Sequence, residues 1–145
     1  MPFHFKMQKV LDYREQLEEE AKVDLALKQR LLEDARALFE RLKTELRQSE
    51  DRLFQAALAP QGERWLMEQY IKGLKGDVAN AAMQTRMNEQ LVDEARKMLA
   101  ARAIERKLLE KLKERQNLQY LREEQLKEQR VNDETATLRY KAPTL

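Results

Sequence analysis

The residue types that most often carry catalysis or metal binding are scarce in this chain of 145 residues. His4 is the only histidine, and there is no cysteine. A metal site needs several such ligands, so we interpret His4 as a solvated residue near the N-terminus. We expect no enzyme activity, no catalytic residue, no metal and no cofactor.

Gly73 and Gly76 are the residues that most resemble part of a phosphate-binding loop. They lack the GK[ST] ending of a Walker loop and therefore do not indicate nucleotide binding. Each glycine costs roughly 1 kcal/mol relative to alanine inside a helix. Two interpretations stay open: tolerated flexibility or a kink near a turn, and close approach of another protein beside Tyr70 and Leu74.

Composition limits the architecture that could position a site. Charged residues make up 37% of the chain and aromatic residues 6%, which is too polar and too poor in aromatics for a globular core. The net charge of +2 is too small to suggest a positive electrostatic field that attracts nucleic acid or membranes. No apolar run is long enough to span a membrane and no signal peptide is recognisable. Membrane association is therefore expected only through partners.

Two apolar stripes with alternating spacings of three and four residues lie on either side of the breaker Pro60-Gln61-Gly62. A period of 3.5 keeps one seam of a helix facing a partner helix. The first stripe is Leu25, Lys28, Leu32, Ala35, Phe39, Leu42, Leu46, Ser49, Leu53 and Ala56. The second stripe is Met67, Ile71, Leu74, Val78, Ala81, Thr85, Asn88, Val92, Ala95 and Leu99. The short breaker allows the second stripe to fold back on the first.

These stripes predict an all-α fold, an antiparallel two-helix coiled-coil hairpin with a longer second helix. We expect one coiled-coil domain over residues 1–145, with a first helix at about 5–59, a turn at 60–63, a second helix at about 64–136 and a tail at 137–145. A turn centred near residue 62 pairs residues whose numbers sum to roughly 124. Residues beyond about Gln119 then have no partner in the chain. This overhang is either a docking surface or a frayed end.

Charge is distributed unevenly along the two helices. Residues 96–130 hold eleven Lys or Arg against six Glu, whereas residues 15–34 hold seven acids against three bases. The predicted register places these segments side by side, so inter-helix pairing accounts for much of the asymmetry. Nucleic-acid binding needs aromatics among the basic residues, and Tyr120 is the only one there. We expect no nucleic-acid partner.

Both ends of the chain carry short motifs. The opening Phe3, Phe5, Met7, Gln8, Val10, Leu11 and Arg14 matches F-x-F-x-L-Q-x-V-L-x-x-R except for Met7, where leucine is usual. Asp133-Glu134 followed by Arg139 matches D-E-x-x-x-x-R, and Tyr70-Ile71-x-x-Leu74 follows the breaker. Together these motifs resemble the FliJ family, a small cytoplasmic component of the bacterial flagellar type III export apparatus.

The resemblance implies a non-enzymatic stalk similar to the stalk subunit of rotary ATPases. Its implied partners are the hexameric export ATPase FliI, the cytoplasmic domain of the export gate protein FlhA and, for some members, export chaperones. It implies a cytoplasmic location at the inner face of the cell membrane, and a role in flagellum biogenesis and hence in motility and chemotaxis.

The same resemblance implies two sets of binding residues. Its export-gate pattern falls on Tyr70, Leu74, Asp77 and Ala81, although Asp77 stands where a small apolar residue is usual and Ala81 also belongs to the second stripe. The opposite end would contact the ATPase ring, with Gln8, Arg14, Arg122, Arg130, Asp133, Glu134 and Arg139 as candidates.

Two other functions stay open. One is a coiled-coil adaptor or export chaperone without a ring-stalk role. The other is a structural rod formed by an extended homodimer. That rod would carry Pro60 and Gly62 inside a long helix, at roughly 3 and 1 kcal/mol per chain, so the hairpin is favoured.

Overall fold

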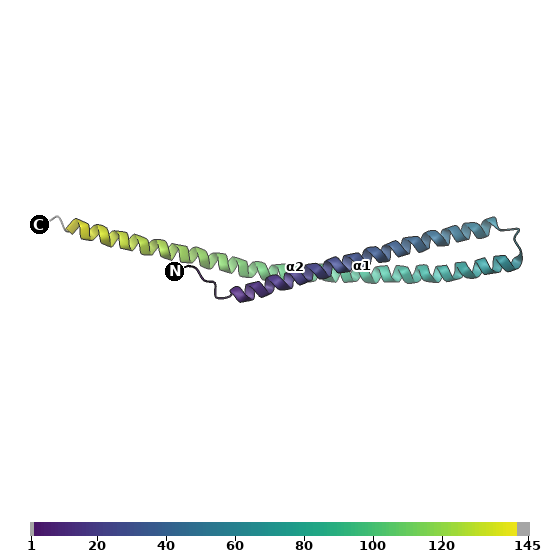
Figure 1. Ribbon diagram of the computed structural model, residues 1–145, viewed down its shortest axis with the longest axis horizontal. Helices are drawn as coiled ribbons and strands as arrows, with labels where there is room; N and C mark the ends of the chain where they lie inside the picture. Colours follow the sequence, from purple (N-terminus) through teal and green to yellow (C-terminus); the bar gives the residue numbers. More distant parts are fainter. Residues whose placement is uncertain (1, 142–145) are drawn as a thin grey trace. The chain divides into compact units, whose positions relative to one another are not determined.

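Two long α-helices form the chain, as Figure 1 shows: α1 (Gln8–Gln55) and α2 (Gln61–Lys141). The computed structural model describes residues 2–141. The predicted all-α hairpin with a longer second helix is confirmed. α1 begins at Gln8, three residues after the expected position. Phe5 precedes the helix and lies in the core, and the Phe5 carbonyl accepts a hydrogen bond of 3.1 Å from the Gln8 N–H.

The connection between the helices lies earlier in the chain than expected, at residues 56–60 and not at 60–63. α1 ends before the predicted limit at Ala59, and α2 begins at Gln61 rather than near Arg64. Pro60 explains the early start of α2, since a residue at a helix N-terminus needs no N–H of its own. Its carbonyl accepts bonds of 3.1 Å from the N–H groups of both Glu63 and Arg64. Pro60 therefore starts the second helix, whereas the first helix ends ahead of the breaker, at Gln55.

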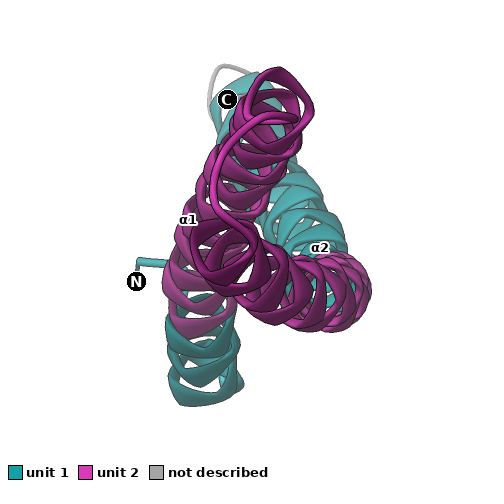
Figure 2. Ribbon diagram, turned by 90° about the vertical axis from the view of Figure 1, so that its right-hand side faces the viewer, with its two compact units in different colours: residues 1–18, 102–145 teal, residues 19–101 magenta. Residues whose placement is uncertain are grey.

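The chain divides into two compact units, coloured separately in Figure 2. Unit 1 comprises Met1–Glu18 and Arg102–Leu145, and unit 2 comprises Glu19–Ala101. Each unit contains a stretch of α1 and a stretch of α2. The units are described separately below.

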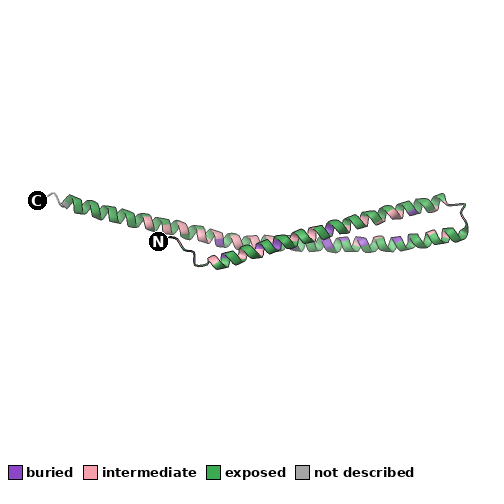
Figure 3. Ribbon diagram, in the orientation of Figure 1, coloured by how far each residue is buried: buried purple, intermediate pink, exposed green. Residues whose placement is uncertain are grey.

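Unit 2 contains both apolar stripes in full. Every stripe residue is buried or half-buried, and the purple and pink positions in Figure 3 follow the contact between the helices. Val92, at 2% exposure, is the most completely buried large side chain. The polar stripe residue Asn88 is also buried, and its Nδ2 donates to the Leu31 carbonyl at 3.2 Å. The predicted seam is thus confirmed residue by residue.

The register within unit 2 is shifted by about four residues from the expected one. Two contacts between the helices define it: the ion pair between Arg36 and Glu89, at 3.4 Å, and the hydrogen bond from Tyr70 to Glu45. Their residue numbers sum to 125 and 115, and the two pairs lie on opposite sides of the seam, so the numbers of facing stripe residues sum to about 120 and not to 124. The reason is the early turn, which is centred near residue 58 and not near residue 62.

Unit 1 is held together by an aromatic and aliphatic cluster. Phe5, Leu11 and Leu109 are buried, with Phe3 and Leu112 packed against them. The rings of Phe3 and Tyr120 are 5.8 Å apart between centroids, which is an ordinary distance for an aromatic pair. The segment before α1 therefore folds over α2 and adds to the core of this unit.

The second helix continues past this cluster. Residues 121–140 are helical and exposed apart from the half-buried Glu124, as expected for an overhang without a partner in the chain. The predicted tail at 137–145 is helical as far as Lys141, and residues 142–145 lie outside the described part. Within residues 2–141, neither helix contains a stretch long and apolar enough to cross a membrane.

Candidate interaction surfaces

The first candidate surface lies early in α2, in unit 2. Tyr70 is 51% exposed, and its hydroxyl donates a hydrogen bond to the Glu45 carboxylate of α1. This bond, followed by partial burial and the negative charge of Glu45, raises the pKa of Tyr70 above its usual value near 10. The ring stays at the surface while its hydroxyl joins the two helices.

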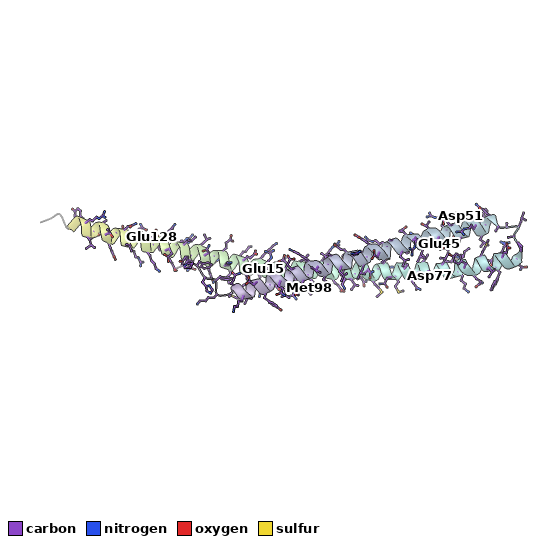
Figure 4. The ribbon with its side chains drawn as sticks, viewed as in Figure 1. Glu15, Glu45, Asp51, Asp77, Met98 and Glu128 are labelled. Carbon is purple, nitrogen blue, oxygen red and sulfur yellow. The ribbon has the colours of Figure 1, made fainter. Side chains whose placement is uncertain are left out.

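The other three residues of the predicted gate site separate into two groups. Leu74 and Ala81 are 5% and 6% exposed and belong to the packed stripe. Asp77 is exposed on α2, where Figure 4 labels it. Tyr70 and Asp77 are seven residues apart, two helical turns, and so lie on one face. The accessible part of the predicted gate site therefore consists of these two side chains, and Leu74 is a core residue.

Gly73 lies on the same face, between Tyr70 and Asp77. A Cβ atom built at Gly73 or at Gly76 would meet nothing within 4 Å. Neither glycine has a positive φ angle. Packing within the described chain therefore does not require glycine at either position.

The second candidate surface lies in unit 1, where two predicted residues face α2 from the start of α1. Gln8 lines an open groove beside the Phe3 cluster, and its side-chain amide donates to Asp12 at 2.8 Å. Arg14 is half-buried, and its guanidinium donates to the Glu105 carbonyl at 3.0 Å. Arg14 thus links α1 to α2 in this unit.

The remaining five predicted residues lie on the exposed part of α2. Helical spacing of about 100° per residue puts four of them in a sector of about 120°. These four are Arg122, Arg130, Asp133 and Glu134. Arg139 lies about 100° outside this sector, on the opposite flank from Glu134. The structure therefore brings together two basic and two acidic side chains on one exposed face.

An ion-pair cluster in unit 1 agrees with the predicted pairing of the acidic segment 15–34 with the basic segment 96–130, although the sequence analysis did not name its residues. Arg106 donates to the carboxylate of the buried Glu18, and to Glu110 at 2.8 Å. These bonds, with that to Glu18 the stronger, raise the pKa of Arg106 above its usual range, so the guanidinium stays charged. The signal for it was the match between Glu18 and Arg106 under the predicted register. Among the described residues, no three His, Cys, Asp or Glu side chains are grouped as metal ligands would be.

Comparison with known families decides the identity. A family model described as flagellar FliJ protein matches residues 3–144. The chain belongs to the FliJ family. No curated protein and no solved structure gives a match to this FliJ chain. The family match spans both units and confirms the resemblance carried by the terminal motifs, so this FliJ chain is a component of the flagellar export apparatus.

Proposed function

We propose that this FliJ chain is a non-enzymatic stalk that engages the hexameric export ATPase FliI and links it to the export gate protein FlhA. The observation that carries the proposal is the exposed, highly charged segment of α2 at residues 121–140. A helix segment with no partner in its own chain gains most of its stability by docking. The ring is the partner that the family suggests for it.

The chemistry of this segment suits a ring better than a single fixed partner. Arg122, Arg130, Asp133 and Glu134 present both signs of charge on one face. Exposed ion pairs are each worth about 0 to 1 kcal/mol, and they exchange readily. A stalk that contacts several subunits in turn needs many weak polar contacts. Apolar residues on this segment, such as Leu126 and Val131, are scattered among the polar ones and form no continuous anchor.

The gate contact is proposed for the other unit. Tyr70 offers an exposed ring whose position is fixed by Glu45, and Asp77 offers a negative charge on the same face. Aromatic side chains held in place are effective anchors because little conformational entropy is lost on binding. Binding to FlhA would hold the protein at the inner face of the membrane.

The test is to mix the purified protein with the cognate export ATPase and to measure hexamer formation and ATP hydrolysis. We expect both to rise. The double variant Arg122→Ala/Arg130→Ala should lose most of this effect. The matched control Arg41→Ala/Arg47→Ala changes two exposed arginines of α1 in unit 2 and should behave as the unchanged protein.

The result that would overturn the stalk proposal is an unchanged hexamer population and rate when the folded protein is added. Binding to export chaperones in the absence of any ring effect would favour the adaptor function instead.

A further inference from the structure

Unit 2 carries large apolar side chains outside its seam. They lie on both helices and are between 38% and 53% exposed. We call the following set the apolar flank: Leu27, Leu31, Leu38, Met87, Leu91 and Met98. None of these residues belongs to the seam, and the proposed function gives none of them a role.

Two side-chain contacts show which residues, those before or those after a stripe residue, lie on each side of the helix pair. Arg36 and Glu89 each follow directly after a stripe residue, and they form an ion pair. Glu45 and Tyr70 each directly precede a stripe residue, and they are hydrogen-bonded. In an antiparallel pair, positions after the stripe meet on one side of the seam and positions before it meet on the other. The two contacts therefore mark opposite sides of unit 2.

The apolar flank lies on the side marked by Tyr70 and Glu45. Leu31 and Leu38 on α1, and Leu91 and Met98 on α2, each directly precede a stripe residue. Leu27 and Met87 are one helical turn before Leu31 and Leu91. Figure 4 labels Met98 beside the helix pair. The opposite side is polar almost throughout: Gln29, Arg36, Lys43 and Glu50 on α1, and Lys75, Ala82, Glu89 and Arg96 on α2.

A helix whose apolar stripe has additional apolar residues along one side has the pattern of a helix that packs against two neighbours. Helices of bundles carry apolar residues at the seam positions and at one adjoining position, because each packs against two others. Within unit 2 each helix has one neighbour. On both helices the additional apolar residues lie on the same side of the pair, so a single partner surface could cover both sets.

We propose that the apolar flank is an interface between two copies of this chain. Packed flank to flank, two copies of unit 2 form a four-helix bundle in which each helix gains its second neighbour. A two-fold arrangement needs a surface that fits itself, and this flank presents three apolar side chains from each helix. The methionines adapt their shape to the facing leucines.

The size of the flank agrees with a weak dimer. Six side chains at about half exposure offer on the order of 400 Å² of apolar surface per copy. An ordinary interface buries about 800 Å² per partner, of which about 60% is apolar. The flank therefore suffices for an interface at the lower end of this range.

The experiment is sedimentation of the full chain over a wide concentration range, with helicity followed by circular dichroism. We expect a reversible change from monomer to dimer. Leu31→Gln/Leu91→Gln should weaken the dimer at least tenfold, and Leu27→Gln/Met98→Gln, at more exposed positions, should do the same. The matched control is Leu108→Gln, which replaces a 62% exposed leucine in unit 1 and should shift the equilibrium less than twofold.

A monomer at every concentration would overturn the proposal, as would a dimer that both flank variants leave unchanged. A monomer whose flank instead binds another protein would assign the surface to that protein. The measurement needs neither the export ATPase nor FlhA, so its outcome is independent of the stalk proposal.

Discussion

Replacing Gly73 and Gly76 by alanine should make the protein more stable. A glycine in the interior of a helix costs roughly 1 kcal/mol relative to alanine, because the unfolded chain loses more freedom and the backbone is more exposed. The new methyl groups meet nothing within 4 Å, so no clash offsets the gain. Helix propensity acts residue by residue, so the two substitutions together should contribute about 2 kcal/mol.

For a chain of this length, 1 kcal/mol corresponds to a change of roughly 2–4 °C in Tm. The double variant Gly73→Ala/Gly76→Ala should therefore melt roughly 4–8 °C higher, as measured by circular dichroism. Ala79→Gly is the matched control, because Ala79 is an exposed residue of the same stretch of α2. It should lower the stability by about 1 kcal/mol.

An unchanged or lower Tm in the double variant, with the control behaving as expected, would refute this reasoning. The same variant separates the two interpretations of the glycines. If they serve close approach of FlhA beside Tyr70, the stabilised protein should bind the gate more weakly. If they are tolerated flexibility, gate binding should be unchanged.

Three further predictions concern single side chains of unit 2. Ser49→Ala should raise the free energy of unfolding in urea by about 1 kcal/mol, because the buried Ser49 hydroxyl has no hydrogen-bond partner in the part of the chain that the structure describes. Leu74→Ala should lower that free energy by about 2–3 kcal/mol. Tyr70→Ala should instead leave helicity intact and weaken binding to the FlhA domain in a pull-down titration. An equal loss of helicity in both variants would contradict the assignment of Tyr70 to a surface. Glu45→Gln should lower the pKa of Tyr70 toward 10, followed by phenolate absorbance against Tyr70→Phe as reference. Since the folded protein holds the Tyr70 proton more tightly than the unfolded chain, this contribution to stability is complete below pH 10 and is lost as the pH rises through the higher folded pKa.

The helix pairing was predictable because it depends on a repeated local pattern. Each stripe residue from Leu25 to Leu99 is buried or half-buried, including the polar Ser49 and Asn88. The bounds of the turn were less accurate because α1 ends at Gln55, ahead of the breaker, and only the backbone geometry shows that Pro60 starts α2. The earlier turn shifts the register of unit 2, which brings Tyr70 to Glu45.

The candidate sites were predictable only in part because a motif does not distinguish contact with a partner from contact within the chain. Leu74 fits an anchor next to Tyr70 in sequence, but its phase on the helix places it in the seam. Arg14 fits an exposed polar contact, but it bonds to the Glu105 carbonyl. Phe3 and Phe5 were recognised only as part of a family motif. They pack in the cluster around Leu109 because the segment before α1 folds back, and the helical periodicity of the sequence does not predict this.

The central claim is that the exposed segment of α2 in unit 1 meets the ATPase ring while the Tyr70 face in unit 2 meets the gate. Because the chain contains no cysteine, single variants Arg130→Cys and Leu66→Cys can each carry one photo-crosslinker. Both positions are exposed, and Leu66 lies one helical turn before Tyr70, on the same face. With both partners present, we predict that position 130 crosslinks to the export ATPase and position 66 to FlhA. Crosslinks from position 66 to the ATPase with none from position 130 would contradict the claim.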